Sequence, residues 1–160
     1  MCPSALLARW PARFDDGMWH DTALTERRCW ELLASTDVAR LAVDIAGQPD
    51  IFPINYAVDR RSLVFRTRAG TKLAGAVVSR YVALEIDGVD PMTRTAWSVV
   101  VKGTAREVSH PAERDAVERL PLVPWVSEIT PEFVRIEPEL VTGREFRVTA
   151  GIDLSAARST

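Results

Sequence analysis

The chain has 160 residues, of which 47% are hydrophobic and 26% charged, and its formal net charge is −2. This composition is ordinary for one globular domain, and the balanced charge argues against nonspecific nucleic-acid binding as the main activity. No window approaches the roughly 20 apolar residues of a membrane span, so a membrane is not an expected partner either. Two cysteines, Cys2 and Cys29, are too few for a disulfide framework or a metal site. We therefore predict a soluble, cytoplasmic protein without a bound metal.

The first predicted element is a helix that follows an irregular N-terminal lead. Residues 1–21 show no clean periodicity and lack the continuous apolar stretch of a signal peptide. Thr25 is a good N-cap with Glu26 in the first turn, and apolar residues follow at helical spacing as far as Leu33. The sequence Ser35-Thr36-Asp37 is expected to end this helix.

Most of the remaining chain is predicted to form strands. Seven segments are rich in apolar, β-branched or aromatic residues and are bounded by turn residues. They are Val38–Ile45, Ile51–Val58, Leu63–Thr67, Tyr81–Ile86, Ala96–Val108, Phe133–Ile136 and Leu140–Val148. Pro53 suggests an edge or a bulge in the second segment, and Gly103 suggests a bend or bulge in the fifth. The short reversal at Asp59–Ser62 predicts a hairpin, and the turn-rich segment Asp87–Arg94 predicts a loop.

The balance of strands and helices indicates the fold class. Beyond the first helix, only Thr71–Ser79 and Pro111–Leu120 have helical character. Six or seven strands with so few helices favour a mainly β fold, a closed or nearly closed antiparallel barrel. A doubly wound sheet would need a helix after nearly every strand. The barrel is expected to form one domain over residues 22–150, and residues 151–160 are expected to form a flexible tail.

The segment Leu63–Arg80 has the properties of an anion site. Its predicted strand enters a helix through a turn at Gly70, and the first N–H groups and the dipole of a helix both favour negative charge. Six Arg or Lys residues and no Asp or Glu lie between Arg60 and Leu84. The local field is therefore positive although the whole chain is not. The segment predicts a phosphate site, and an ordinary solvated strand-to-helix turn is the alternative.

The order and spacing of these segments resemble the FMN-binding split-barrel superfamily of pyridoxamine 5′-phosphate oxidase-like proteins. The resemblance is greatest to the branch that contains the nitroimidazole-resistance flavoproteins. The segments that carry it are ERRCWELLAST, DVARLAV, IFPINYAV, LVFRTRAGTKLA, VALEIDGVD, TAWSVVVKGTA and FVRIEPELVTGREF. It implies a six- to seven-stranded antiparallel split β-barrel with a few short helices. It also implies a homodimer that holds FMN in a groove at the dimer interface.

The resemblance further implies which residues bind the cofactor. Backbone groups along the polar edge of the isoalloxazine ring would come from Pro53, Ile54, Asn55 and Tyr56. The phosphate-binding positions would be Arg66, Thr67, Thr71 and Lys72. Their chemistry is suitable, because a phosphate dianion needs N–H donors and fixed cations. Further contacts would come from Trp97, Ser98, Thr142 and Arg144. Trp97 fits a dimer interface first and a flavin neighbour second.

One departure from the family pattern bears on the reaction. Where the pyridoxine-phosphate oxidases carry an Arg-x-His arrangement, Gly143–Arg147 holds no histidine, and both His20 and His110 lie outside the expected groove. Oxidation of a vitamin B6 phosphate is therefore not expected, and no general base is apparent. The leading interpretation is a flavin-dependent oxidoreductase that acts on an unidentified small molecule, with a nicotinamide as a candidate electron donor.

Two alternatives to this interpretation stay open. The first is a deazaflavin coenzyme in place of FMN, because its longer acidic tail would suit additional cationic surface. The arginines that could supply that surface are Arg60, Arg61, Arg68 and Arg80. The second is a non-catalytic flavin- or haem-binding protein that acts as a sensor or in storage.

Overall fold

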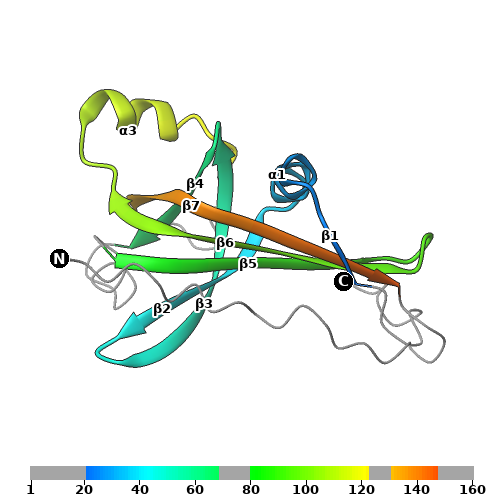
Figure 1. The fold of residues 1–160 in the computed structure, drawn as a ribbon. Helices are drawn as coiled ribbons and strands as arrows, with labels where there is room; N and C mark the ends of the chain where they lie inside the picture. Colours follow the sequence, from blue (N-terminus) through cyan, green and yellow to red (C-terminus); the bar gives the residue numbers. More distant parts are fainter. Residues whose placement is uncertain (1–20, 69–79, 123–130, 148–160) are drawn as a thin grey trace.

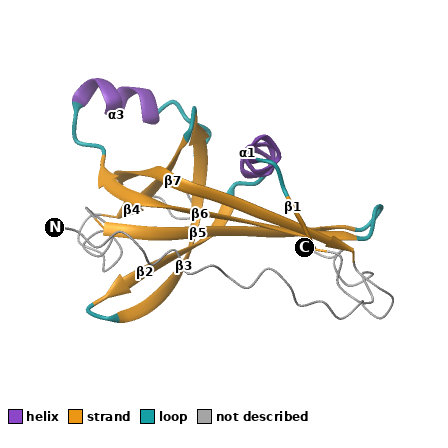
Figure 2. Cartoon of the chain, in the orientation of Figure 1, coloured by secondary structure: helices purple, strands orange, loops and turns teal. Residues whose placement is uncertain are grey.

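The structure is a computed structural model that describes residues 21–68, 80–122 and 131–147. These residues form seven strands and two helices (Figures 1 and 2). The elements are β1 Asp21–Ala23, α1 Glu26–Ser35, β2 Val38–Ile45, β3 Gln48–Asp59, β4 Ser62–Arg68, β5 Arg80–Asp90, β6 Thr95–Glu107, α3 Pro111–Val117 and β7 Pro131–Arg147. The predicted lead up to residue 20, the predicted helix Thr71–Ser79 and the predicted tail lie outside the described residues. Neither described helix is long and apolar enough to cross a bilayer.

The sheet closes on itself as a barrel. The strands follow the order β1-β7-β4-β3-β2-β5-β6, and a further pairing of β6 with β7 closes the ring. Every pairing is antiparallel. Residues 131–136 of β7 pair with β4, whereas residues 144–146 pair with the short strand β1. The mainly β, antiparallel split-barrel prediction is therefore confirmed.

Local sequence explains how α1 begins and where it packs. The Thr25 hydroxyl accepts a hydrogen bond from the backbone N–H of Arg28 at 3.3 Å, as an N-cap should. The helix buries Cys29, Leu32 and Leu33 in the core of the barrel. A Cβ atom at Gly143 on β7 would lie 2.7 Å from Cys29 Sγ. A residue without a side chain at that position therefore allows α1 to approach the sheet closely.

Alternation along the strands creates two apolar cores. The larger core fills the barrel with inward-facing side chains, among them Leu41, Tyr56, Leu63, Phe65 and Ile136. The smaller one lies between α3 and the outer side of the barrel. Its buried members are Val64, Val108, Val117 and Phe133. The chain thus uses both sides of β4, because Leu63 and Phe65 face inward while Val64 faces α3.

The structure corrects the sequence-based predictions in three places. Residues 131–147 form one continuous strand rather than the predicted pair Phe133–Ile136 and Leu140–Val148. Pro138 does not interrupt β7, because it lies opposite Gly103, where a β-bulge shifts the register of the pairing with β6. The predicted loop Asp87–Arg94 is shorter than expected, because β5 continues to Asp90 and pairs there with the start of β6. The strand β1 was not predicted at all, and it contains only three residues.

Candidate functional site

Five of the predicted cofactor-binding residues lie on one outer face of the barrel, formed by β3, β2, β5, β6 and β7. Directly paired residues of antiparallel strands point to the same side, so the register defines this face. One row of direct partners crosses all five strands: Pro53, Arg40, Glu85, Val100 and Thr142. The neighbouring row joins Asp87, Ser98 and Arg144. Asn55 belongs to the same face, since it lies two residues from Pro53 and pairs with Val38.

The outer face has an ion-pair cluster around Arg40 and a cleft beside Pro53. The guanidinium of Arg40 forms ion pairs with Asp87 and, at 3.2 Å, with Glu85. Hydrogen bonding and proximity to Asp87 raise the pKa of Arg40, so its charge is permanent. A cleft of about 450 Å³ opens beside Pro53 at the edge of the face. It is lined by Ser35, Thr36, Asp37, Val38, Ala39, Arg40, Pro53 and Asp87.

Two of the predicted ring-binding residues point the other way. Ile54 and Tyr56 have 5% and 2% of their surface exposed and belong to the barrel core. The Tyr56 hydroxyl donates to the Leu33 carbonyl and pairs with Thr36 Oγ1, each at 2.7 Å. Burial raises the pKa of this hydroxyl, so it remains neutral. Neither side chain is therefore available to a ligand, and the backbone N–H of Tyr56 already donates to the Asp37 carbonyl at 2.9 Å.

Arg66 lies at one end of the outer face. Strands β3 and β4 pair from their turn, where Asp59 is opposite Ser62, as far as Tyr56, which is opposite Phe65. Asn55 and Arg66 come next on the two strands, and both side chains point outward. The Arg66 Nε atom is fully buried, and no acceptor within the described segments reaches it. An unsatisfied buried donor is costly, and an anion beside Arg66 would relieve that cost. The residue therefore fits the predicted phosphate-binding role.

The other predicted phosphate ligands are less well defined. Thr67 is 5% exposed and follows Arg66 on the inward side of β4. Thr71 and Lys72 fall outside the described residues, so the structure does not place them. Of the four predicted phosphate ligands, Arg66 is thus the one whose surroundings in the structure favour that role.

Trp97 is not on the outer face. Its neighbour Ser98 points outward, whereas Trp97 packs against the larger core. A Cβ atom at Gly88 would lie 2.5 Å from Trp97 Cζ2, which shows that the indole covers this glycine on β5. The structure therefore separates Trp97 from Ser98, Thr142 and Arg144, the predicted ligands on the same two strands.

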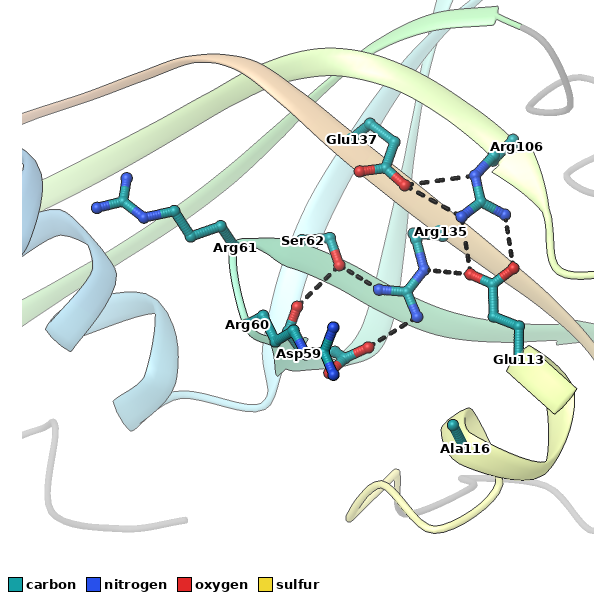
Figure 3. Close-up of a pocket in the computed structure, with 9 residues that line it drawn as sticks. All are labelled: Asp59, Arg60, Arg61, Ser62, Arg106, Glu113, Ala116, Arg135 and Glu137. Atoms are coloured by element: carbon teal, nitrogen blue, oxygen red, sulfur yellow. Dashed lines mark hydrogen bonds and ion pairs between the residues drawn. The ribbon is translucent and has the colours of Figure 1, made fainter.

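A second cavity, of about 420 Å³, lies beside the β3–β4 turn and is lined mostly by charged residues (Figure 3). Arg135, which is 8% exposed, donates to Glu113 Oε1 and Asp59 Oδ2, each at 2.7 Å, and also to Ser62. Arg106 holds Glu113 as well, through bonds of 2.7 and 2.9 Å. The donors of Arg106 and Arg135 are occupied by protein acceptors, so these two arginines form an ion-pair network with Asp59, Glu113 and Glu137.

Comparison with known proteins identifies the family. The family model described as pyridoxamine 5′-phosphate oxidase matches residues 25–145, most of the chain. The chain belongs to the pyridoxamine 5′-phosphate oxidase family. A relative of the chain is the uncharacterized protein Rv0080 of Mycobacterium tuberculosis, which is 44% identical over 117 residues. That match covers 70% of this chain and 76% of the relative.

Solved structures support the same assignment. The FAD-binding protein of Mycobacterium smegmatis is 38% identical and has a TM-score of 0.73, with 79% of this chain and 99% of that chain covered. A candidate 5-nitroimidazole antibiotic resistance protein of Bacteroides thetaiotaomicron has a TM-score of 0.64 over 80% of this chain and 89% of its own. Its identity of 13% shows a shared fold only. The family resemblance expected from the sequence, including the fold of that branch, is confirmed.

Two parts of the site were missed by sequence reasoning. The Arg40–Asp87 ion pair on the outer face joins residues 47 positions apart, and only the β2–β5 register brings them together. Phe133, which lies directly opposite Arg66, was expected only as a strand residue. Alternation along β2 would have indicated that Arg40 faces outward, but nothing local indicates its partner. Within the described segments, no three His, Cys, Asp or Glu residues come together as a metal site would require.

Proposed function

We propose that this protein binds a flavin nucleotide, FMN, on its outer face and acts as a flavin-dependent oxidoreductase on a small molecule. The observation that carries the proposal is the convergence of Pro53, Asn55, Ser98, Thr142 and Arg144 on one face. Arg66, with its unsatisfied buried Nε, lies at the end of that face. A cation there suits the phosphate, and the backbone of β3 suits the polar edge of the ring. The FAD-binding protein of M. smegmatis, at 38% identity, supports a flavin as the ligand.

The chain's own residues would bind and orient the flavin, and the bound flavin would supply hydride or electron transfer. Arg66 would hold the phosphate, and backbone groups of β3 before Tyr56, where this strand pairs with β2 alone, would face the ring. The cleft beside Pro53 is a suitable place for a small substrate. A nicotinamide is the proposed electron donor.

The phosphate role of Arg66 makes a specific prediction. Arg66→Ala should weaken FMN binding about 10- to 100-fold, because a charge-assisted bidentate contact is worth roughly 1.5–3 kcal/mol. Riboflavin, which lacks the phosphate, should bind both proteins about equally. Fluorescence titration of each flavin with wild-type and variant protein measures this difference. Arg119→Ala, which removes an exposed arginine beyond α3, is the control and should change neither affinity. An unchanged FMN affinity in the Arg66 variant would remove this residue from the site.

The same outer face is proposed to form a homodimer. Every large apolar side chain exposed on a described strand lies on it, and the set is Val38, Ile51, Tyr81, Val89 and Leu140. Exposed apolar side chains gathered on one sheet face favour association, because their burial is favourable by about 25 cal/mol per Å². A flavin bound on this face would lie between the two copies.

Replacing Ile51, which is 63% exposed, with lysine should shift the protein toward the monomer, because a desolvated lysine opposes association. Sedimentation velocity at several protein concentrations measures the shift. Met92→Lys is the matched control, since Met92 is 87% exposed but lies in the β5–β6 turn rather than on a strand. The proposed dimer face is wrong if the wild type is a monomer at all concentrations, or if both variants dissociate equally.

A further inference from the structure

The Arg66 guanidinium lies against the aromatic ring of Phe133. Arg66 and Phe133 are direct partners in the β4–β7 ladder. The Arg66 Cζ atom lies over the Phe133 ring, 5.6 Å from its centroid. At that distance the electron-rich ring face attracts the cation. Phe133 is 3% exposed, so little water competes with this contact.

Arg66 has few other interactions to fix its direction. Within the described segments the Arg66 side chain has no hydrogen bond or ion pair, and its buried Nε is without an acceptor. A long arginine side chain that is not held loses rotamer freedom when it binds a ligand, and this loss weakens binding. The ring of Phe133 is therefore the feature that can preorganise this guanidinium.

The ring is itself held firmly. It belongs to the smaller core, with Val64 on one strand and Val117 on α3. Arg114 of α3 lies over the same ring, 5.4 Å from its centroid. The helix is fixed to the barrel by Glu113, which accepts from Arg106 and Arg135 (Figure 3). Packing, a second cation and an ion-pair network thus fix the surface against which Arg66 rests.

We infer that Phe133 is a positioning residue, which holds the Arg66 guanidinium ready for the phosphate of a flavin nucleotide. The inference rests on the proposed flavin function and adds a residue that does not itself contact the ligand. It assigns the smaller core and α3 a part in cofactor affinity, in addition to their part in stability. Loss of the ring should therefore affect ligands that carry a phosphate and spare those that do not.

Phe133→Leu keeps an apolar side chain but removes the ring, and its effect on two ligands tests the inference. FMN affinity should fall about three- to tenfold, because an Arg66 side chain without the ring would lose more rotamer freedom when it binds the phosphate. Riboflavin affinity should stay the same, and Phe133→Tyr should restore FMN binding. The control Val43→Ala removes a similar volume from the larger core, which does not contain the Phe133 ring. It should lower the melting temperature but leave the ratio of FMN to riboflavin affinity unchanged.

A second variant keeps the test decisive if Phe133→Leu does not fold. Pentafluorophenylalanine at position 133 preserves the shape of the ring but reverses its quadrupole, so it should lower the same affinity ratio. An unchanged ratio in a folded variant, or an equal loss for both flavins, would overturn the role of Phe133. Failure of the wild type to bind either flavin would instead overturn the proposed function, so the two failures are distinguishable. In an Arg66→Ala background, Phe133→Leu should cause no further loss of FMN affinity.

Discussion

Replacing Gly103 with alanine is expected to destabilise the protein by about 3 kcal/mol or more. A Cβ atom at this position would lie 2.1 Å from the backbone oxygen of Glu137 and 2.9 Å from the Cα atom of Pro138. Both neighbours are main-chain atoms of β7, so neither can rotate away as a flexible side chain could. The strands β6 and β7 would have to separate at the bulge between Lys102 and Gly103, where the barrel closes.

Chemical denaturation of wild type and Gly103→Ala, followed by circular dichroism, measures this loss. The control is Gly47→Ala in the β2–β3 turn, where φ is +83° and no atom lies within 4 Å of the added Cβ. That substitution should lower the free energy of unfolding by about 1 kcal/mol, because alanine is strained in a left-handed backbone conformation. If Gly103→Ala were no more harmful than Gly47→Ala, the close contact between β6 and β7 would be wrong.

Replacing Arg135 with methionine should cost about 2–3 kcal/mol of stability. The guanidinium is largely buried and links β7 to Asp59 in the β3–β4 turn and to Glu113 on α3. Methionine preserves much of the side-chain volume but leaves both carboxylates without this partner. Removing one member of a fully buried pair costs about 3–5 kcal/mol, and we expect less here because the carboxylates are about one quarter exposed.

The matched control and the pH dependence separate this network from a surface ion pair. Arg27→Met breaks an ion pair with Glu31 in which the two side chains are 84% and 42% exposed, and it should change stability little.

Hydrogen bonding to Arg106 and then to Arg135 lowers the pKa of Glu113. Its ionised form therefore stabilises the fold above the unfolded pKa of about 4.3, and this contribution is lost as the pH falls through the lower folded value. The cost of Arg135→Met should accordingly be larger at pH 7 than at pH 3, and a cost independent of pH would contradict the network.

Local patterns were sufficient to predict much of the fold. The bounds of β2 follow from alternation between Val38 and Ile45, and the start of α1 follows from the cap at Thr25. Pro53 was expected at an edge or bulge, and at that residue β3 pairs with β2 alone, since its pairing with β4 begins at Tyr56. In each case the deciding interactions are within a few residues along the chain or within one strand pair.

Features that depend on distant partners could not be predicted in the same way. The uninterrupted strand β7 depends on the register that brings Pro138 opposite Gly103, and the sequence around Pro138 contains only a reason for a break. Arg135 and Asp59 are 76 positions apart, so neither indicates the other. The site shows the same division. Alternation separates outward Asn55 from inward Tyr56, but the contact of Arg66 with Phe133 requires the β4–β7 pairing.

Flavin binding is the step on which the proposed function depends, and it can be measured directly. Purified protein should be titrated into FMN, FAD, riboflavin and a deazaflavin coenzyme while flavin fluorescence and visible absorption are followed. We predict saturable binding of FMN with one flavin per chain, and weaker binding of riboflavin because it cannot use Arg66. Tighter binding of FAD would keep the outer face as the site but change the nucleotide. No saturable change with any flavin, at protein concentrations up to about 100 μM, would contradict the assignment of this face to a flavin.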